Sequence, residues 1–179
     1  MLPKLASMAF AAPLLLAACA TPEPKSSIEK FAHTALIDAT GNTVGEATLI
    51  ANGSVIELAA EVFGLSPGEH GIHVHTTGKC DAPTFSTAGG HLNPNAHKHG
   101  TMNPAGPHMG DLPNIVVGAN GTGSIRTTLV GASEELRAAM FDADGSAVII
   151  HAGPDDYKTD PAGNSGGRIA CGVVTIMKS

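Results

Sequence analysis

A chain of 179 residues, of which 42% are hydrophobic and 15% charged, can form one globular domain and is too apolar to be intrinsically disordered. The net charge of −6 and the 3% aromatic content argue against a nucleic-acid partner, which requires a basic surface and base-stacking side chains. The chain has nine histidines, nearly as many as its ten lysines and arginines together. Histidine is the most common metal ligand in proteins, so the composition favours a metal site.

Residues 1–18 have the pattern of a signal peptide. One charge, at Lys4, precedes an apolar run that is too short to span a bilayer. The run ends in Leu-Ala-Ala-Cys at 16–19, which resembles the lipobox of bacterial lipoproteins, where the cysteine is lipidated after cleavage. Alternatively, Cys19 is lost by cleavage further along the chain. We expect a periplasmic protein that is anchored to a bacterial membrane through Cys19, with residues 19–30 as a flexible tether.

Lipidation of Cys19 leaves Cys80 and Cys171 as an even pair in an exported, oxidising compartment, where disulfides persist. The sequence therefore predicts a Cys80–Cys171 disulfide, and the alternative is two buried free thiols. The bond would close a loop of about ninety residues and thereby restrict the unfolded chain.

From residue 31 onward, short apolar or alternating segments are separated by turn signals such as Asn52-Gly53 and Asn120-Gly121. This pattern predicts an all-β domain, an antiparallel sandwich or barrel of eight strands. The predicted strands cover residues 34–39, 46–51, 54–62, 71–76, 114–119, 124–130, 147–151 and 169–177. One helix is predicted over 133–140, with Ser133 as a candidate N-cap.

Two stretches, 78–112 and 153–167, have little periodicity and are rich in Gly and Pro. Loops of this length in a compact domain are usually functional. A metal ion and a disulfide would explain how such loops stay ordered.

His73 and His75 are two residues apart in a predicted strand, so both rings project from one face of the sheet, which suits chelation of a metal. The alternative is a pair of solvated histidines on a polar face. The same alternation places His70 on the other face, as a hydrogen-bonded structural residue. Further candidate ligands lie in the first long loop and at a strand end: His91, His99, His108, Asp111 and His151.

With these residues in place, the chain from near Phe31 to its C-terminus closely resembles the secreted bacterial copper,zinc superoxide dismutases. Six ordered motifs carry the resemblance: Gly-Ile-His-Val-His at 71–75, Ala-Gly-Gly-His-Leu-Asn-Pro at 88–94, Lys-His-Gly at 98–100, His-Met-Gly-Asp-Leu-Pro-Asn at 108–114, Val-Ile-Ile-His at 148–151 and Gly-Asn-Ser-Gly-Gly-Arg-Ile-Ala-Cys-Gly at 163–172. It implies one domain over 31–179, an eight-stranded antiparallel Greek-key barrel with two long metal-site loops.

The resemblance also implies a copper ion and a zinc ion as cofactors. The implied copper ligands are His73, His75, His91 and His151. The implied zinc ligands are His91, His99, His108 and Asp111. His91 then bridges both metals, and the Lys-His-Gly motif selects His99 over the nearby His97.

Two further roles follow from the resemblance. Asp155 would accept hydrogen bonds from one copper and one zinc histidine, His73 and His99. Arg168, three residues before Cys171, would be held beside the copper site to attract an anion. Otherwise, Asp155 is a solvated carboxylate and Arg168 forms a salt bridge at a strand end.

The implied reaction is dismutation of superoxide to oxygen and hydrogen peroxide, with His91 passing a proton to the product. The alternative is a periplasmic copper or zinc store or chaperone without catalysis. Such proteins usually bind Cu(I) through Met or Cys, and the methionines of this chain form no cluster. A monomer and a homodimer both agree with the sequence.

Overall fold

The computed structural model describes residues 28–178, and the predicted signal peptide and Cys19 lie outside the described residues. The elements, in chain order, are β1 (Ile28–Asp38), β2 (Thr43–Asn52), β3 (Val55–Val62), β4 (Gly68–His70), β5 (Ile72–His75), the 3-10 helix η1 (Ser86–Ala88), β6 (Ile115–Val117), β7 (Gly123–Thr128), α1 (Ser133–Met140), β8 (Ala147–His151), β9 (Arg168–Val173) and β10 (Thr175–Ile176). No helix in this part of the chain is long and apolar enough to cross a membrane.

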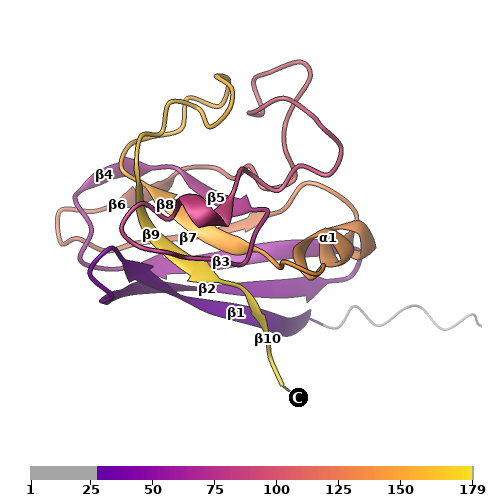
Figure 1. Ribbon diagram of the computed structural model, residues 1–179, viewed down its shortest axis with the longest axis horizontal. Coiled ribbons are helices and arrows are strands. Elements are labelled where there is room, and N and C mark those ends of the chain that lie inside the picture. Colours follow the sequence, from indigo (N-terminus) through magenta and orange to yellow (C-terminus); the bar gives the residue numbers. More distant parts are fainter. Residues whose placement is uncertain (1–27, 179) are drawn as a thin grey trace, which may run out of the picture.

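The strands form one antiparallel sheet that curls into a nearly closed barrel (Figure 1). The strand order is β4-β6-β7-β3-β2-β1-β9-β8-β5, and β10 pairs with β1. β4 and β5 are joined through Gly71 alone, so the first and last strands of this order meet along the chain. The predicted all-β antiparallel barrel is therefore confirmed, although the described residues form ten strands and not the predicted eight.

The barrel has an apolar core because successive side chains of its strands point alternately inward and outward. In β3, Ile56, Leu58 and Ala60 are buried, whereas Glu57 and Glu61 lie on the outer side. In α1, Leu136 and Met140 are four residues apart and both point into the same core. Burial of these apolar side chains is the main force that holds the barrel together.

Three details of the strand prediction differ from the structure. β1 begins at Ile28, so residues 28–30 belong to a strand and not to the tether. The short strand β4 was not predicted. The last predicted strand is divided into β9 and β10 at Val174, whose N–H donates to Ser146 and not to a ladder partner.

The predicted helix has the expected bounds, but its N-cap differs. Ala132 occupies the N-cap position and forms no side-chain capping bond, and Ser133 is the first helical residue. The N–H of Ser133 donates to the carbonyl of Ser54, which connects the helix to the β2–β3 turn.

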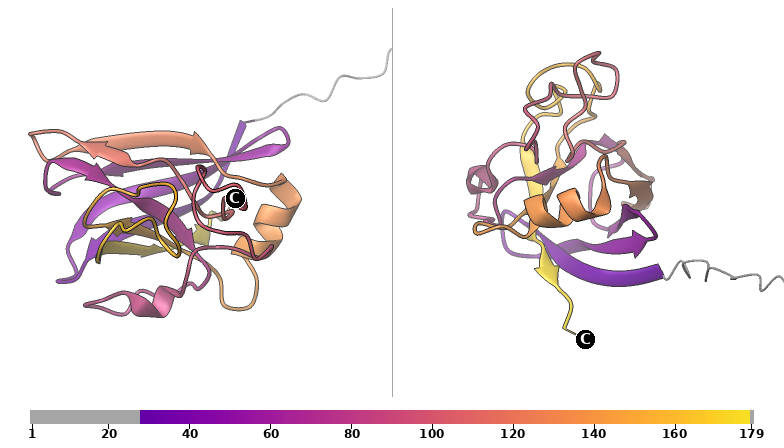
Figure 2. Two further views of the ribbon diagram at one scale, coloured as in Figure 1. Left: turned by 90° about the horizontal axis from the view of Figure 1, so that it is seen from above. Right: turned by 90° about the vertical axis from the view of Figure 1, so that its right-hand side faces the viewer.

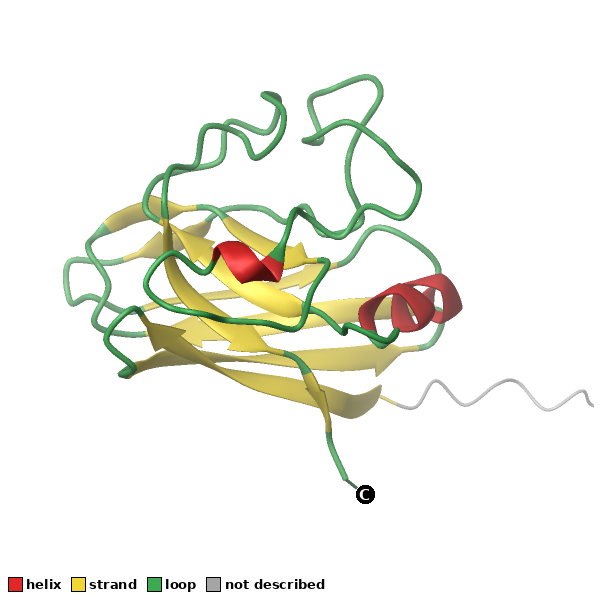
Figure 3. Cartoon of the chain, viewed as in Figure 1, coloured by secondary structure: helices red, strands yellow, loops and turns green. Residues whose placement is uncertain are grey.

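The two long loops lie over the same side of the barrel (Figure 3), and they leave the antiparallel pair β5 and β8 at opposite ends. We call the chain between β5 and β6 the first loop (76–114) and the chain between β8 and β9 the second loop (152–167). They lie side by side in two perpendicular views (Figure 2). β5 and β8, from which they start, are hydrogen-bonded neighbours, with Ile72 opposite Ile150 and His75 opposite Ala147.

A disulfide fixes the start of the first loop to the sheet. Cys80 is bonded to Cys171 of β9, with their Cα atoms 5.7 Å apart, as predicted. Phe85, next to η1, is fully buried in a small apolar cluster that includes Ile149 and Cys171. The segment that follows the disulfide therefore packs firmly against β8 and β9.

Candidate metal centre

Four histidines converge where the two loops meet the barrel. His73 and His75 belong to β5, His151 ends β8, and His91 comes from the first loop. All four are buried, and none has more than 8% of its surface exposed to solvent. One ring nitrogen of each lies within 4.8 Å of the corresponding nitrogen of every other, which is a spacing that suits a common metal ion.

The nitrogens that face this common point have no hydrogen-bond partner. They are Nδ1 of His73 and Nε2 of His75, His91 and His151. An unpaired polar atom in a protein interior is unfavourable, and four of them facing one another fit a bound ion that accepts all four lone pairs. The residues thus fit a four-nitrogen metal site, a donor set that suits copper.

The opposite nitrogens are hydrogen-bonded, and this fixes each ring. Nδ1 of His75 donates to the carbonyl of Gly89 at 3.0 Å, and Nδ1 of His151 donates to the carbonyl of Gly166 at 3.1 Å. A carbonyl can only accept, so the proton of each ring is on Nδ1 and the lone pair is on Nε2. The lone pairs are therefore directed toward the metal position before any metal binds.

Burial keeps these rings neutral. Because burial disfavours the charged form, the pKa of His73 is lowered to about 3, that of His75 to about 2 and that of His151 to about 4. The pKa of His91 is lowered for the same reason. A neutral imidazole is the form that binds a metal, so the site is ready to bind at neutral pH.

These shifts predict that the metal-free protein loses stability in mild acid. The folded-state pKa values of His73, His75 and His151 lie below the ordinary value of about 6.5, so their stabilising contribution is present above pH 6.5 and is lost as the pH falls. Each ring can lower the free energy of unfolding by up to about 1.4 kcal/mol per pH unit. Urea unfolding of metal-free protein at pH 7, 6 and 5 measures this slope, and a flat profile contradicts it.

A second group lies on the other side of His91. Oδ1 of Asp111 is 2.7 Å from Nδ1 of His91, 3.1 Å from Nδ1 of His99 and 3.1 Å from Nδ1 of His108. Three imidazole nitrogens and one carboxylate oxygen are a donor set that suits four-coordinate zinc. Oδ2 of Asp111 accepts the N–H groups of Gly100 and His108, which holds the carboxylate in place.

The charges in this second group are arranged for metal binding. Burial raises the pKa of Asp111, but hydrogen bonds from His108, His91 and His99 outweigh burial and hold the pKa far below its ordinary value. Burial also lowers the pKa of His99, but hydrogen bonds to Asp111 and Asp155 outweigh it and raise the pKa to about 9. The carboxylate is therefore ionised. In the absence of metal His99 is protonated and donates from both ring nitrogens, so a metal that binds here displaces a proton.

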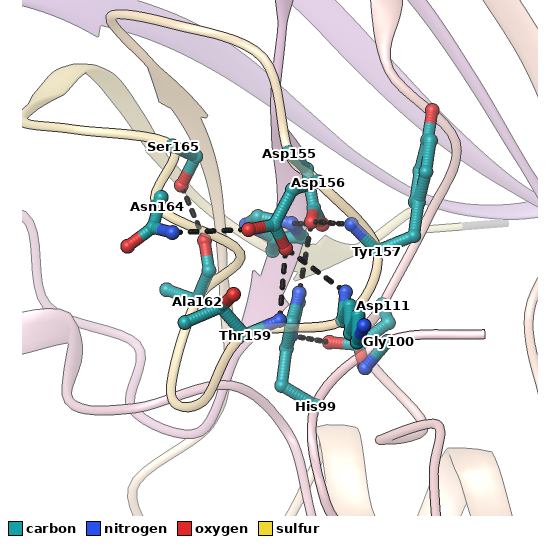
Figure 4. Close-up of polar contacts among 12 residues, drawn as sticks. His99, Gly100, Asp111, Asp155, Asp156, Tyr157, Thr159, Ala162, Asn164 and Ser165 are labelled. Atoms are coloured by element: carbon teal, nitrogen blue, oxygen red, sulfur yellow. Dashed lines mark hydrogen bonds and ion pairs between the residues drawn. The ribbon is translucent and has the colours of Figure 1, made fainter. Parts of the chain in front are cut away.

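Asp155 connects the two groups (Figure 4). Its Oδ2 is 2.8 Å from Nε2 of His73, and its Oδ1 is 2.9 Å from Nε2 of His99. Asp155 is 3% exposed, and its Oδ1 also accepts the N–H of Tyr157 at 2.6 Å. Gly163 packs directly on this carboxylate with φ +61°, and a Cβ atom there would overlap Oδ1. The later part of the second loop, at Gly163, thus packs directly against Asp155 near the start of the same loop.

Comparison with known proteins agrees with this geometry. The family model for copper/zinc superoxide dismutase (SODC) matches residues 43–174. The chain belongs to the copper/zinc superoxide dismutase family. The family is named for enzymes that use copper and zinc and act on superoxide, and the two His and Asp groups of this chain could hold these metals.

Relatives cover most of the chain. It is 44% identical to superoxide dismutase [Cu-Zn] 2 of Aquifex aeolicus over 148 residues. This alignment covers 80% of this chain and 85% of the relative. It is 43% identical to superoxide dismutase [Cu-Zn] of Caulobacter vibrioides over 75% of this chain and 79% of that protein. A SOD-like protein from Bacillus subtilis has a similar structure, with a TM-score of 0.74, 37% identity and coverage of 82% of this chain and 99% of that one.

A pocket opens beside the four-histidine group. A cavity of about 280 Å³ is lined by His75, Gly90, His91, Asn93, His108, His151, Pro161, Ala162 and Arg168. Arg168, the first residue of β9, is the one cation among these lining residues of the described chain. The pocket therefore joins the four-histidine group to solvent beside a positive charge.

Backbone carbonyls of the disulfide segment hold Arg168. Its Nη1 donates to the carbonyl of Phe85 at 2.7 Å, and its Nη2 donates to the carbonyl of Gly89 at 2.6 Å. The carbonyl of Gly89 also accepts the ring Nδ1–H of His75. The guanidinium is thus fixed relative to a residue of the four-histidine group and forms no salt bridge in the described residues.

The remaining histidines lie outside both groups. His70 is buried, and its ring nitrogens lie 2.8 Å from the carbonyl of His151 and 2.9 Å from that of Ser66. His97 is exposed and bonds to the carbonyl of Pro107. His33 lies exposed on β1. His70 is a hydrogen-bonded structural residue, as predicted, and His97 lies outside the second group, as the Lys-His-Gly motif implied.

Four residues that line the pocket were not predicted as site residues: Gly90, Asn93, Pro161 and Ala162. Asn93 follows His91 by two residues, so its nearness to a candidate ligand was a usable signal. Pro161 and Ala162 belong to the second loop, and their place over the pocket depends on how the two loops pack. Their sequence carries no sign of this contact.

Proposed function

We propose that this chain catalyses the dismutation of superoxide to oxygen and hydrogen peroxide. His73, His75, His91 and His151 would hold copper, and His91, His99, His108 and Asp111 would hold zinc. The observation that carries the proposal is the position of His91, whose Nε2 faces three other unpaired ring nitrogens and whose Nδ1 faces Asp111. Copper bound there would supply one-electron redox chemistry, and zinc would supply a positive charge without redox chemistry.

His91 is the residue best placed to move a proton. It lines the pocket, and its Nε2 has no hydrogen-bond partner in the protein. Its Nδ1 is held at 2.7 Å from Asp111, so the ring keeps its orientation when Nε2 gains or releases a proton. Formation of hydrogen peroxide from superoxide consumes protons. A ring that lines the pocket is placed to donate one directly to a molecule bound there.

Arg168 attracts and positions the anionic substrate. Both of its terminal nitrogens are already fixed by carbonyls, so the guanidinium loses little freedom when an anion binds beside it. Lys158, a second cation of the second loop, does not line the pocket. A single fixed cation at a narrow entrance focuses attraction on the reaction site even though the chain is acidic overall.

Arg168→Ala is expected to keep both metals and to lose roughly tenfold in kcat/KM, about 1.4 kcal/mol, because only the attraction of the anion is removed. Arg168→Glu should lose more. The wild-type rate should fall as salt rises, and Arg168→Ala should show a weaker dependence on salt. Arg126→Ala is the matched control, because Arg126 is an exposed arginine of β7 that pairs with Glu57 of β3 and does not line the pocket. Equal rates and salt slopes for Arg168→Ala and wild type would contradict this role.

The store or chaperone alternative has little support. The donors of both groups are nitrogen and oxygen atoms. Soft sulfur donors are absent from them, and among the described methionines Met109 and Met140 are buried in the apolar core. A store for Cu(I) would use sulfur donors, so the dismutase proposal is preferred.

The direct test of the proposal is metal content together with superoxide consumption by the purified mature protein. We expect one copper and one zinc per chain and a rate that disappears when copper is removed and returns when it is restored. Protein that binds both metals but consumes no superoxide would support a store instead.

We propose that the mature protein is periplasmic and is anchored to a membrane by lipid at Cys19, the residue that ends the lipobox-like sequence. Cys19→Ser removes the thiol that takes the lipid, so the protein is expected to move from the membrane fraction to the soluble fraction or to remain unprocessed. Mass spectrometry of the mature N-terminus measures this directly. An unmodified N-terminus beyond residue 19 in wild-type protein would contradict the anchor.

A further inference from the structure

Asp160 of the second loop binds two consecutive residues of the first loop. Its Oδ1 accepts the backbone N–H of His99 at 2.6 Å. Its Oδ2 forms an ion pair with Nζ of Lys98 at 3.0 Å. The same carboxylate therefore uses both oxygens to connect the loops, and neither bond involves the ring of a candidate metal ligand.

The bond to His99 completes the fixation of that residue. The His99 ring is held between Asp111 at Nδ1 and Asp155 at Nε2. Asp160 holds the backbone of the same residue from another direction. A ring can keep a fixed position only when its backbone is also fixed, so Asp160 affects how well His99 can serve the second group.

Asp160 is also next to the pocket. The two residues that follow it, Pro161 and Ala162, line the cavity that opens on His75, His91 and His151. The bond from Asp160 to His99 thus holds this part of the second loop, which we call the rim (159–163), against the first loop. The loops meet again where Met102 donates to the carbonyl of Tyr157 at 2.9 Å, but Tyr157 does not line the pocket.

The neighbouring carboxylate of Asp156 differs in one respect. It accepts hydrogen bonds from Lys158, Thr159 and Asn164, all of which belong to the second loop. Asp156 therefore orders its own loop and Asp160 crosses to the other one. The pair provides a matched comparison, because both are exposed aspartates in one segment of five residues.

We propose that Asp160 is a positioning residue that fastens the pocket rim to the backbone of His99, so that retention of the zinc-side metal and order of the rim depend on each other. The inference rests on the proposed function, because it takes His99 as a zinc ligand. Asp160 contacts neither substrate nor metal. It acts on the second group through the backbone of His99 and on the pocket through its neighbour Pro161.

The first test is the rate at which zinc leaves the copper- and zinc-loaded protein into an excess of a chromogenic chelator. Asp160→Ala is expected to release zinc at least about tenfold faster, because a charge-assisted hydrogen bond to a backbone N–H is lost. Asp160→Asn keeps an oxygen acceptor for the His99 N–H and should stay within about threefold of wild type. Lys98→Met should also stay within about threefold, because exposed ion pairs contribute little. Asp156→Ala removes bonds within the second loop but leaves the bond to His99, so it is the control for general loosening of that loop and should stay within about threefold of wild type.

The second test is amide hydrogen exchange of the rim, with and without zinc. In wild type we expect removal of zinc to speed exchange at 159–163, and in Asp160→Ala we expect fast exchange whether or not zinc is present. The inference is overturned if Asp160→Ala releases zinc within about twofold of wild type, if Asp160→Asn fails to restore slow release, or if Asp156→Ala is as fast as Asp160→Ala. Failure of wild type to bind zinc would instead overturn the proposed function.

Discussion

Replacing His151 with alanine is expected to lower superoxide consumption by at least about a hundredfold while the protein keeps its zinc. Nε2 of His151 is one of the four unpaired nitrogens of the copper group, and its Nδ1 is bonded to the carbonyl of Gly166. His151 has no place in the second group, so the three rings and Asp111 remain complete. Copper is therefore expected to bind weakly and zinc to bind as in wild type.

The measurement is copper and zinc content by elemental analysis, followed by the rate of superoxide consumption at matched protein concentration. His97→Ala is a suitable control, because His97 is an exposed histidine whose ring bonds to the carbonyl of Pro107 outside both groups. It should keep both metals and the wild-type rate. A folded His151→Ala protein that lost copper and zinc equally would contradict the division into two sites.

Much of the fold could be predicted because alternation leaves a strong signal in long strands. In β3, the buried positions recur every second residue from Ile56 to Val62, with the charged Glu57 and Glu61 between them, and this alternation predicts the strand and its buried face. β4 has three residues and runs into β5 through Gly71, so it is too short to show a period of its own. Residues 28–30 are polar or exposed, and they become a strand only because β2 pairs with them.

The site was partly predictable from local sequence. The spacing of His73 and His75 placed both on one side of a strand, and the structure has them in one group with His91 and His151. The division of the ligands into copper and zinc sets, by contrast, came from the resemblance. The partners of Asp160 and the lining by Pro161 depend on the packing of two loops that are about sixty residues apart, and local patterns do not encode contacts of such range.

Replacement of Asp111 is expected to remove zinc first and to separate the two roles of its carboxylate. Oδ1 faces the three rings, whereas Oδ2 accepts the N–H groups of Gly100 and His108. Asp111→Ala removes both functions, and Asp111→Asn keeps an oxygen that can accept backbone N–H groups but loses the charge that zinc requires. Both variants should therefore lose zinc affinity by about a hundredfold or more, while the four nitrogens of the copper group remain.

The metal-free forms distinguish the two roles. Asp111→Ala leaves two backbone N–H groups in the first loop without their acceptor, and each lost bond to a charged group destabilises by about 1.5–3 kcal/mol, so its free energy of unfolding should fall clearly below that of Asp111→Asn. Zinc affinity by chelator competition and urea unfolding of the metal-free proteins measure the two effects independently. Zinc retained in either variant would remove Asp111 from the ligand set. If the two metal-free variants had the same free energy of unfolding, the carboxylate would serve only the metal and would not stabilise the loop.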